Sequence, residues 1–347
     1  MKKLLVFFLT ALLLTMPARA AAPGTAAQAT ILLHGPSGRV LASYNADKRL
    51  PMASTTKIMT ALLALERCAM DDAVEIRGEW TRTEGSSMYL RAGEICTVRD
   101  LLHGLMLSSG NDAALALAGC CAADTESFVA MMNEKAEELG MSNTCFRNPH
   151  GLPEEGHFST AADMAKLMAA AMENDEFRAA VSCRYYKREG HSYKNHNKLL
   201  WQCEGVNGGK TGYTRAAGRC LVSSCCRNDL ELICVTLNDR RDWADHAALY
   251  DWAFANFEGS CVPGGALMAK VPVVGGAAPY AEAAAAEDIK LCVDKGSKVK
   301  LTADMERFVY APIKRGDPAG LLHLWVNDTE AALVPLRWAR DVPEVKG

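Results

Sequence analysis

The chain has 347 residues, of which 49% are hydrophobic and 23% charged, and its formal net charge is −3. This length is ample for two folded domains with a sizeable core. A mildly acidic chain without basic runs argues against nucleic acid or an anionic membrane surface as a partner.

The first twenty residues have the pattern of a secretory signal peptide. Lys2 and Lys3 give a positive start, residues 4–16 form an apolar core, and Ala18-Arg19-Ala20 is a cleavage site of small residues. The apolar run is short for a membrane span, which disfavours an uncleaved anchor. We therefore expect cleavage after residue 20 and an exported protein, in the cell envelope or periplasm or secreted.

The cysteines give conflicting signals about the redox setting. Exported proteins usually carry disulfides, but the 13 cysteines here are an odd number. They show no CxxC and no Cys/His zinc pattern, and HExxH is absent. Many flank apolar runs such as "ALALAGCC" and "ELICVTL", where they look like small core residues. We expect mostly reduced thiols, no metal site and no cofactor.

Strands and helices are expected in a regular order up to about residue 258. The sequence predicts two short strands around a Gly-Pro-Ser-Gly turn in 29–45, a buried helix in 50–68, helices over 98–172 with breaks at 107–112 and 147–160, strands at 219–226 and 230–238, and a helix at 242–257. This order indicates an α+β domain with a mainly antiparallel sheet, which we place at residues 24–258.

The sequence pattern changes at the turn-rich segment "GSCVPGG", and the new pattern continues over residues 259–347. Short β-like runs dominate it, so we expect a small all-β C-terminal domain. Residues 278–289, "APYAEAAAAEDI", are expected as a loop or a short helix. The β-like runs are 269–276, 289–296, 307–313 and 321–327.

Ser54-Thr-Thr-Lys57 places a hydroxyl and an amine three residues apart where the buried helix is expected to begin. This spacing puts both side chains on one helix face. A serine hydroxyl becomes a nucleophile when a base takes its proton, and burial and nearby cations can lower the pKa of a lysine enough for that task. The alternative is a capping serine followed by an exposed lysine, but the apolar run that follows disfavours a solvated Lys57.

Residues 106–114, "MLSSGNDAA", hold Ser109-Gly110-Asn111 in a break between two helical stretches. A serine and an amide can relay protons and hydrogen-bond a peptide substrate there. By itself the segment also fits an ordinary Ser-Gly turn with a helix cap at Asn111 or Asp112.

Residues 204–220, "EGVNGGKTGYTRAAGRC", allow two interpretations. A phosphate-binding P-loop, GxxxxGK[ST], would need a glycine at the position of Glu204, and ATP is scarce outside the cytoplasm. On a strand, Lys210 would supply positive charge, Thr211 a hydroxyl for a carboxylate, and Gly212 room for the backbone to approach a ligand.

Together the three segments are the SxxK, SxN and KTG set of penicillin-binding proteins and serine β-lactamases. The chain further resembles the D-alanyl-D-alanine carboxypeptidases of the low-molecular-mass penicillin-binding class. The resemblance covers about residues 29–258 well and the tail less specifically. It rests on the segments 45–66, 101–118, 146–168 and 208–224.

The resemblance implies a penicillin-binding/β-lactamase-like domain, with an antiparallel sheet and a helical subdomain, followed by a small all-β C-terminal domain. It implies that Ser54 is the acylated nucleophile, that Lys57 is the general base, and that Ser109 shuttles protons between Lys57 and Lys210. Ser54 would attack the bond between two D-alanines of a peptidoglycan pentapeptide and release the last one, and β-lactam antibiotics would acylate the same serine.

The resemblance also implies a set of substrate-binding groups. Asn111 would hydrogen-bond the substrate amide and Thr211 the terminal carboxylate, beside Lys210 and Gly212. The backbone N–H groups of Ser54 and Tyr213 would form the oxyanion hole.

Other functions stay open at this point. A serine β-lactamase shares the motifs, but no ExxLN-like segment supplies the extra base for rapid deacylation. Endopeptidase or transpeptidase activity depends on groove loops, and a non-catalytic wall-binding protein is poorly motivated because every motif residue is intact. Membrane attachment is open too, because the end "ALVPLRWARDVPEVKG" has no long apolar face.

Two further positions are ambiguous. Some relatives hold the substrate carboxylate with an arginine after the second strand that follows KTG, where this chain has Arg240 and Arg241. Solvated turn residues are the favoured interpretation of both. His150 in "NPHGL" either borders the groove or makes structural hydrogen bonds, so it is not counted as catalytic.

Overall fold

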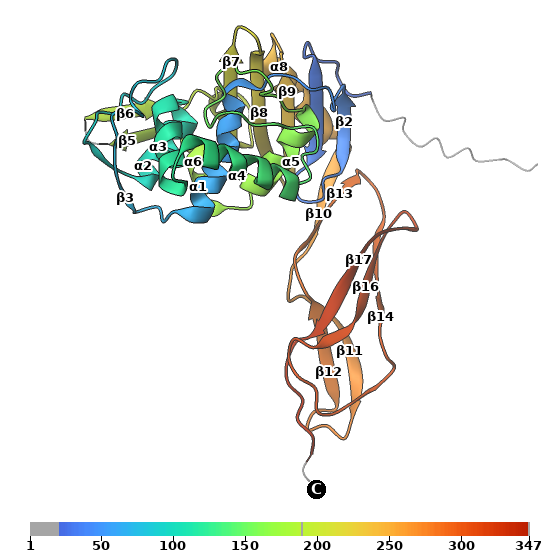
Figure 1. Cartoon of the computed structure of the whole chain (residues 1–347). Helices are drawn as coiled ribbons and strands as arrows, with labels where there is room; N and C mark the ends of the chain where they lie inside the picture. Colours follow the sequence, from blue (N-terminus) through green and yellow to red (C-terminus); the bar gives the residue numbers. More distant parts are fainter. Residues whose placement is uncertain (1–20, 189, 346–347) are drawn as a thin grey trace, which may run out of the picture.

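The computed structural model describes residues 21–188 and 190–345, so the predicted signal peptide lies outside the described residues. A head of helices and strands stands on an elongated stalk made of strands (Figure 1). The short pair β10–β13 lies where the head meets the stalk.

The head is built on a five-stranded antiparallel sheet in the order β2-β1-β9-β8-β7. The central strand β9 is buried at every position. Its residues Ile233 and Val235 join the core of the helical side, whereas Leu232 and Cys234 pack with α8, so both faces of the sheet are covered. The strands are β1 Ala29–His34, β2 Val40–Tyr44, β7 Val206–Thr214, β8 Gly218–Arg227 and β9 Leu230–Leu237.

The predicted helices are confirmed, with a break before α3 as expected, but the second break is longer than predicted, 139–160, and a further break at 122–124 was not predicted. The helix expected within 50–68 begins as a 3-10 turn, Ala53–Thr56, and continues as α1, whose first eight residues are all buried. A capping box between Thr97 and Asp100 starts α2, and the Thr160 hydroxyl caps α5. The helices are α1 Lys57–Arg67, α2 Val98–Leu107, α3 Asn111–Cys121, α4 Thr125–Glu138, α5 Ala161–Ala171, α6 Asp175–Ser182, α7 Leu199–Gln202 and α8 Asp242–Asn256.

The stalk confirms the all-β expectation for the C-terminal part. Six of its strands form one sheet in the order β14-β16-β17-β12-β11-β15, with a hydrophobic core of its own that includes Leu324 and Leu336. The strands after α8 are β10 Phe257–Val262, β11 Leu267–Val274, β12 Tyr280–Ala285, β13 Ile289–Asp294, β14 Val299–Asp304, β15 Val309–Tyr310, β16 Pro318–Val326 and β17 Thr329–Trp338.

The expectation of a loop or short helix at 278–289 is wrong, because Tyr280–Ala285 forms the strand β12. Alanine favours helices, but burial of Ala281, Ala283 and Ala285 in the stalk core outweighs that preference. The hairpin β5–β6, Tyr185–Arg188 and His191–Lys194, and the small pair β3–β4, Ala73–Glu75 and Ile95–Thr97, were not anticipated from the sequence.

Within residues 21–188 and 190–345, no single helix is long and apolar enough to cross a membrane, although the bent pair α3–α4 passes the same test by length and composition.

Candidate active site

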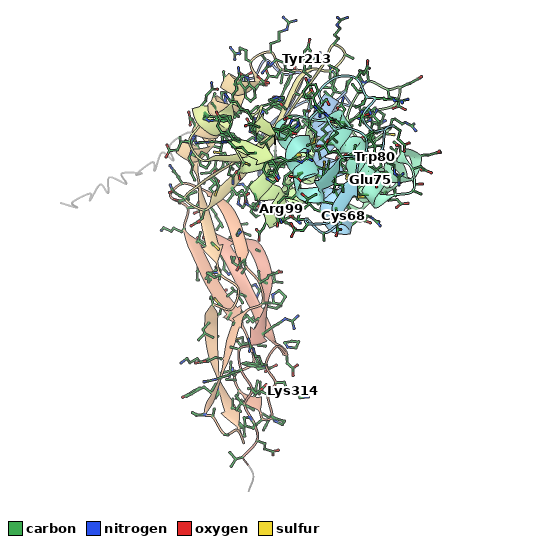
Figure 2. The ribbon with its side chains drawn as sticks, turned by 90° about the vertical axis from the view of Figure 1, so that its left-hand side faces the viewer. Cys68, Glu75, Trp80, Arg99, Tyr213 and Lys314 are labelled. Atoms are coloured by element: carbon green, nitrogen blue, oxygen red, sulfur yellow. The ribbon has the colours of Figure 1, made fainter. Side chains whose placement is uncertain are left out.

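The three sequence motifs meet in one groove of about 1190 Å³ in the head. Ser54 and Ser109 line it from the helical side, and Thr211, Gly212 and Tyr213 line it from β7. Tyr213 lies at the end of the head that is farthest from the stalk (Figure 2). The strand interpretation of the Gly-Gly-Lys-Thr segment is confirmed, because the segment lies inside β7 and precedes no helix, as a P-loop would.

A strained turn presents Ser54 to the groove. Ala53 has a φ of +49°, a left-handed conformation that is uncommon for a residue with a Cβ atom. The hydroxyl of Thr55 donates to the Met52 carbonyl at 2.7 Å, and that of Thr56 donates to the Ala53 carbonyl at 2.8 Å. These bonds hold the turn, which fixes the nucleophile candidate at the start of α1.

Lys57 is fully buried directly beneath Ser54. Its Nζ atom lies 3.1 Å from Ser54 Oγ, 2.7 Å from Asn111 Oδ1 and 2.6 Å from the His150 carbonyl oxygen. Burial first, and then the positive charge of Lys210, lower the pKa of Lys57 well below its usual value, although Asp112 opposes this. A neutral amine can donate to the other two acceptors and accept the Ser54 proton with its lone pair.

The SxN segment is held in an unusual backbone conformation at the rim. Ser109 is buried, with a φ of +59°, and its hydroxyl makes no hydrogen bond to Lys57 or Lys210 in the described part of the chain. Asn111 begins α3 and bridges the site, because its Oδ1 accepts from Lys57 and its Nδ2 donates to the Glu84 carbonyl at 2.6 Å.

Lys210 and Gly212 fix the opposite wall. Lys210 is almost fully buried, its Nζ donates to the Thr211 carbonyl at 2.8 Å, and burial lowers its pKa from 10.5 to about 7. A Cβ atom added to Gly212 would lie 3.0 Å from the backbone nitrogen of Ser54 and 3.1 Å from the Met52 carbonyl oxygen. Glycine therefore lets β7 approach the turn that carries Ser54.

Arg219, on the β7–β8 wall, was not predicted from the sequence as a residue of the site. The Arg219 guanidinium makes a bidentate pair with the buried carboxylate of Asp242, with N···O distances of 2.7–3.1 Å. The Trp243 ring lies beside it, 5.4 Å from the guanidinium carbon, and all three residues line the groove. The hairpin turn after KTG could have placed Arg219, but not its partner Asp242, on this wall, because Arg219 pairs with Tyr213 across the two strands.

The two ambiguous positions are now placed. Arg241 pairs with Asp245 at 2.8 Å with its side chain 64% exposed, and Arg240 is exposed, so neither lines the groove. His150 contributes its backbone carbonyl to Lys57, and burial lowers the pKa of its ring to about 4. The ring of His157 is structural, because it bridges the Thr56 hydroxyl and the Arg147 backbone.

Comparison with known proteins agrees with this geometry. The family described as D-alanyl-D-alanine carboxypeptidase matches residues 16–241, and the C-terminal domain of penicillin-binding protein 5 matches residues 260–344. The carboxypeptidase DacF of Bacillus subtilis is 35% identical over 334 residues, covering 91% of this chain and 86% of its own length. The chain belongs to the D-alanyl-D-alanine carboxypeptidase family.

Other members of the family extend the match over both parts of the molecule. The carboxypeptidase DacC of Escherichia coli is 34% identical over 93% of this chain and 86% of its own. The crystal structure of penicillin-binding protein 5 from Haemophilus influenzae superposes with a TM-score of 0.77 at 29% identity, covering 94% of this chain and 100% of that one. The predicted fold class is confirmed, and the chain is a serine-type carboxypeptidase.

Proposed function

We propose that this enzyme removes the terminal D-alanine from peptidoglycan stem peptides through an acyl-enzyme on Ser54, and that β-lactams acylate the same oxygen. The observation that carries this proposal is the 3.1 Å contact between Ser54 Oγ and the buried amine of Lys57. Family membership supports the substrate, because the relatives are D-alanyl-D-alanine carboxypeptidases.

In the acylation step, Ser54 Oγ attacks the carbonyl carbon of the penultimate D-alanine while Lys57 Nζ takes the hydroxyl proton. The proton then passes to the nitrogen of the departing D-alanine as the C–N bond breaks. Ser109 is the proposed carrier, because it lines the same groove as Ser54. The products are an ester on Ser54 and free D-alanine.

Deacylation uses the same base. Lys57 takes a proton from water, the hydroxide attacks the ester carbonyl, and Ser54 Oγ leaves with the proton that Lys57 returns. Asn111 keeps Lys57 in place through its 2.7 Å contact and would offer its amide to the substrate backbone.

The developing oxyanion is assigned to the backbone N–H groups of Ser54 and Tyr213. The close approach of Gly212 to the Ser54 nitrogen supports this assignment, because it brings the two chain segments to one point. Loss of a single oxyanion donor typically costs about 2.7–4 kcal/mol of transition-state stabilisation. A residue larger than glycine at position 212 would separate the two donors.

The terminal carboxylate of the substrate is assigned to Thr211, assisted by the charges of Lys210 and Arg219. Arg219 replaces Arg240 and Arg241 as the candidate, because it lines the same groove as Thr211 and they do not. Its side chain is 42% exposed and the Asp242 pair holds it in one orientation, so its remaining N–H groups can reach a ligand.

The proposed domain division is 24–258 for the catalytic part and 259–347 for the β-rich part, with cleavage of residues 1–20 on export. The separate hydrophobic core within the β-rich part and two separate family matches support the division. The elongated stalk supports a spacer role for the β-rich part (Figure 1). Such a spacer would hold the groove away from an attached surface.

The test is the intact mass of residues 21–347 after brief incubation with benzylpenicillin, beside Ser54→Ala and the control Ser86→Ala. Ser86 also lines the groove. We expect a penicilloyl adduct on the parent chain and the control and none on Ser54→Ala, together with D-alanine release from a D-Ala-D-Ala peptide. An adduct on Ser54→Ala, or penicillin destroyed without an adduct, would overturn the proposal.

A further inference from the structure

Two cysteines at the far ends of the two catalytic helices lie in contact. Lys57 begins α1, which ends just before Cys68, and Asn111 begins α3, which ends with Cys121. The two helices pack together, and the Sγ atoms of Cys68 and Cys121 are 3.7 Å apart. Cys68 lies at the edge of the head opposite Tyr213, on the side away from the groove (Figure 2).

We propose that Cys68 and Cys121 form a disulfide in the exported enzyme. A disulfide needs the sulfurs about 2.05 Å apart, a change within reach of side-chain rotation and a small movement of the two helix ends. Cys68 is an extended C-cap followed by the mostly exposed turn 69–72, which is hydrogen-bonded to residues 98 and 99, and Cys121 is followed by the exposed segment 123–127. The proposal rests on export but not on the catalytic mechanism.

The oxidant is an external disulfide, either oxidised glutathione or the disulfide of a thiol oxidase. The Cys68 thiolate attacks it and forms a mixed disulfide, releasing one external thiol. Cys121 then attacks the Cys68 sulfur and releases the second external thiol. The two cysteines lose two protons and two electrons, and the external disulfide gains them. Burial raises the pKa of the Cys121 thiol, which favours Cys68 as the first attacker.

The neighbouring thiol of Cys120 is a less suitable partner. Cys120 also lies near Cys68, because both residues line one pocket, but the 3.7 Å sulfur contact of Cys68 is with Cys121. A metal site is a poor alternative for the three sulfurs, since no group of His, Cys, Asp and Glu within the described residues could hold an ion. The contact therefore favours a single bridge between α1 and α3.

The bridge would join residues 53 apart in sequence and tie together the ends of the helices that lie away from the catalytic groups. A closed loop of this length restricts the unfolded chain, so the bridge stabilises the fold. The distances around Lys57 and Asn111 at the opposite ends need not change. We expect a higher melting temperature and unchanged activity near 25 °C.

The first experiment maps the thiols of the full chain from residue 21. The protein is incubated with oxidised glutathione, free thiols are blocked with N-ethylmaleimide, and the digest is analysed without reduction. We expect a Cys68–Cys121 linked peptide whose mass is that of the two free peptides minus two hydrogens. Blocked Cys68 and Cys121, stable glutathione adducts on either, or a Cys68–Cys120 link would each overturn the proposal.

The second experiment compares melting temperatures with and without dithiothreitol. The oxidised parent chain should melt roughly 5–15 °C above the reduced one. Cys68→Ser and Cys121→Ser should each lose this difference. Cys145→Ser is the matched control that keeps it, because Cys145 is also half-buried and, among the described residues, its sulfur contacts the Phe146 carbonyl and no second cysteine. If the serine variants fail to fold, the peptide map of the parent chain alone decides.

If the melting temperature of the parent chain is the same with and without dithiothreitol, the disulfide does not stabilise the fold. Penicillin acylation is measured on the same samples. Loss of the adduct with the bridge intact would reject the catalytic proposal alone, whereas a missing bridge with normal acylation would reject the disulfide alone.

Discussion

The groove has a helical wall, which carries Ser54, and a strand wall, which is formed by β7 and β8. The two walls are prepared for catalysis in different ways. On the helical wall, Lys57 already contacts Ser54, Asn111 and the His150 carbonyl. The base that accepts the Ser54 proton is therefore in position before substrate binds. On the strand wall, the one hydrogen bond of Lys210 Nζ within the described residues goes to the neighbouring Thr211 carbonyl, at 2.8 Å. The helical wall is organised by the protein itself, whereas the strand wall has charge and hydroxyl groups available for a ligand.

The same contrast appears in the two lysines. Both are buried, and burial is the first cause of the lowered pKa of each. The positive charge of Lys210 lowers the pKa of Lys57 further, so a residue of the strand wall adjusts the basicity of the lysine on the helical wall. Variants of the helical wall should therefore change the rate of the acylation step. Variants of the strand wall should change substrate binding and the pH dependence of the rate.

The largest effect is expected for Lys57→Met, which removes the base but keeps an unbranched apolar stem in the buried site. Acylation by benzylpenicillin should slow about 10²–10⁴-fold, the usual contribution of a positioned base. Stopped-flow or quenched mass measurements give the acylation rate constant. Circular dichroism checks that the variant is folded, and a folded variant that acylates within tenfold of the parent chain would remove Lys57 from the mechanism.

An intermediate effect is expected for Lys210→Met, read as a pH profile. A base must be neutral to act, so acylation rises as pH climbs through the pKa of Lys57. Removing the positive neighbour raises that pKa, and the acid limb of the profile should move to higher pH. Lys198→Met, which changes a lysine that lines the groove, should leave the limb in place. If the acid limb of the Lys210→Met profile does not move, the charge of Lys210 does not control the pKa of Lys57.

The same variant also tests the cost of burying Lys210. Its pKa is lowered to about 7 in the folded chain and is 10.5 ordinarily, so the unfolded chain binds more protons between those values. The parent chain should therefore gain stability from this group as pH rises from 7 to 10.5. Lys210→Met should be more resistant to urea than the parent at pH 6, with a difference that shrinks by pH 9.5. Equal differences at both pH values would contradict the shift.

The sequence predicted most of the helical wall and less of the strand wall. Ser54 and Lys57 are three residues apart, so local helix geometry alone brings them together. Thr211 and Gly212 were identified from the KTG motif, and the structure places both in the groove. Arg219 and Asp242 are distant from each other in sequence and meet only through strand pairing and the start of α8, which no local pattern encodes.

The fold shows the same division between local and long-range information. The strands β8 and β9 and the helix α8 carry strong apolar patterns and were predicted. The strand β12 was not, because its alanines favour a helix until Ala281 and Ala283 find a core to fill. The strand β17 contains Pro335, which lacks an N–H donor and weakens any strand prediction.

The smallest effect, and the finest test of the strand wall, is expected for Arg219→Gln. This variant loses the guanidinium that we assign to the substrate carboxylate, so KM for a D-Ala-D-Ala peptide should rise about tenfold with little change in kcat. Arg241→Gln is the matched control, because Arg241 also pairs with an aspartate near the start of α8 but lies outside the groove. A peptide with a C-terminal amide removes the carboxylate from the other side, and the parent chain and Arg219→Gln should then differ little. If the variant lowered activity equally on the acid and the amide, Arg219 would support the β7–β8 hairpin and not bind the substrate.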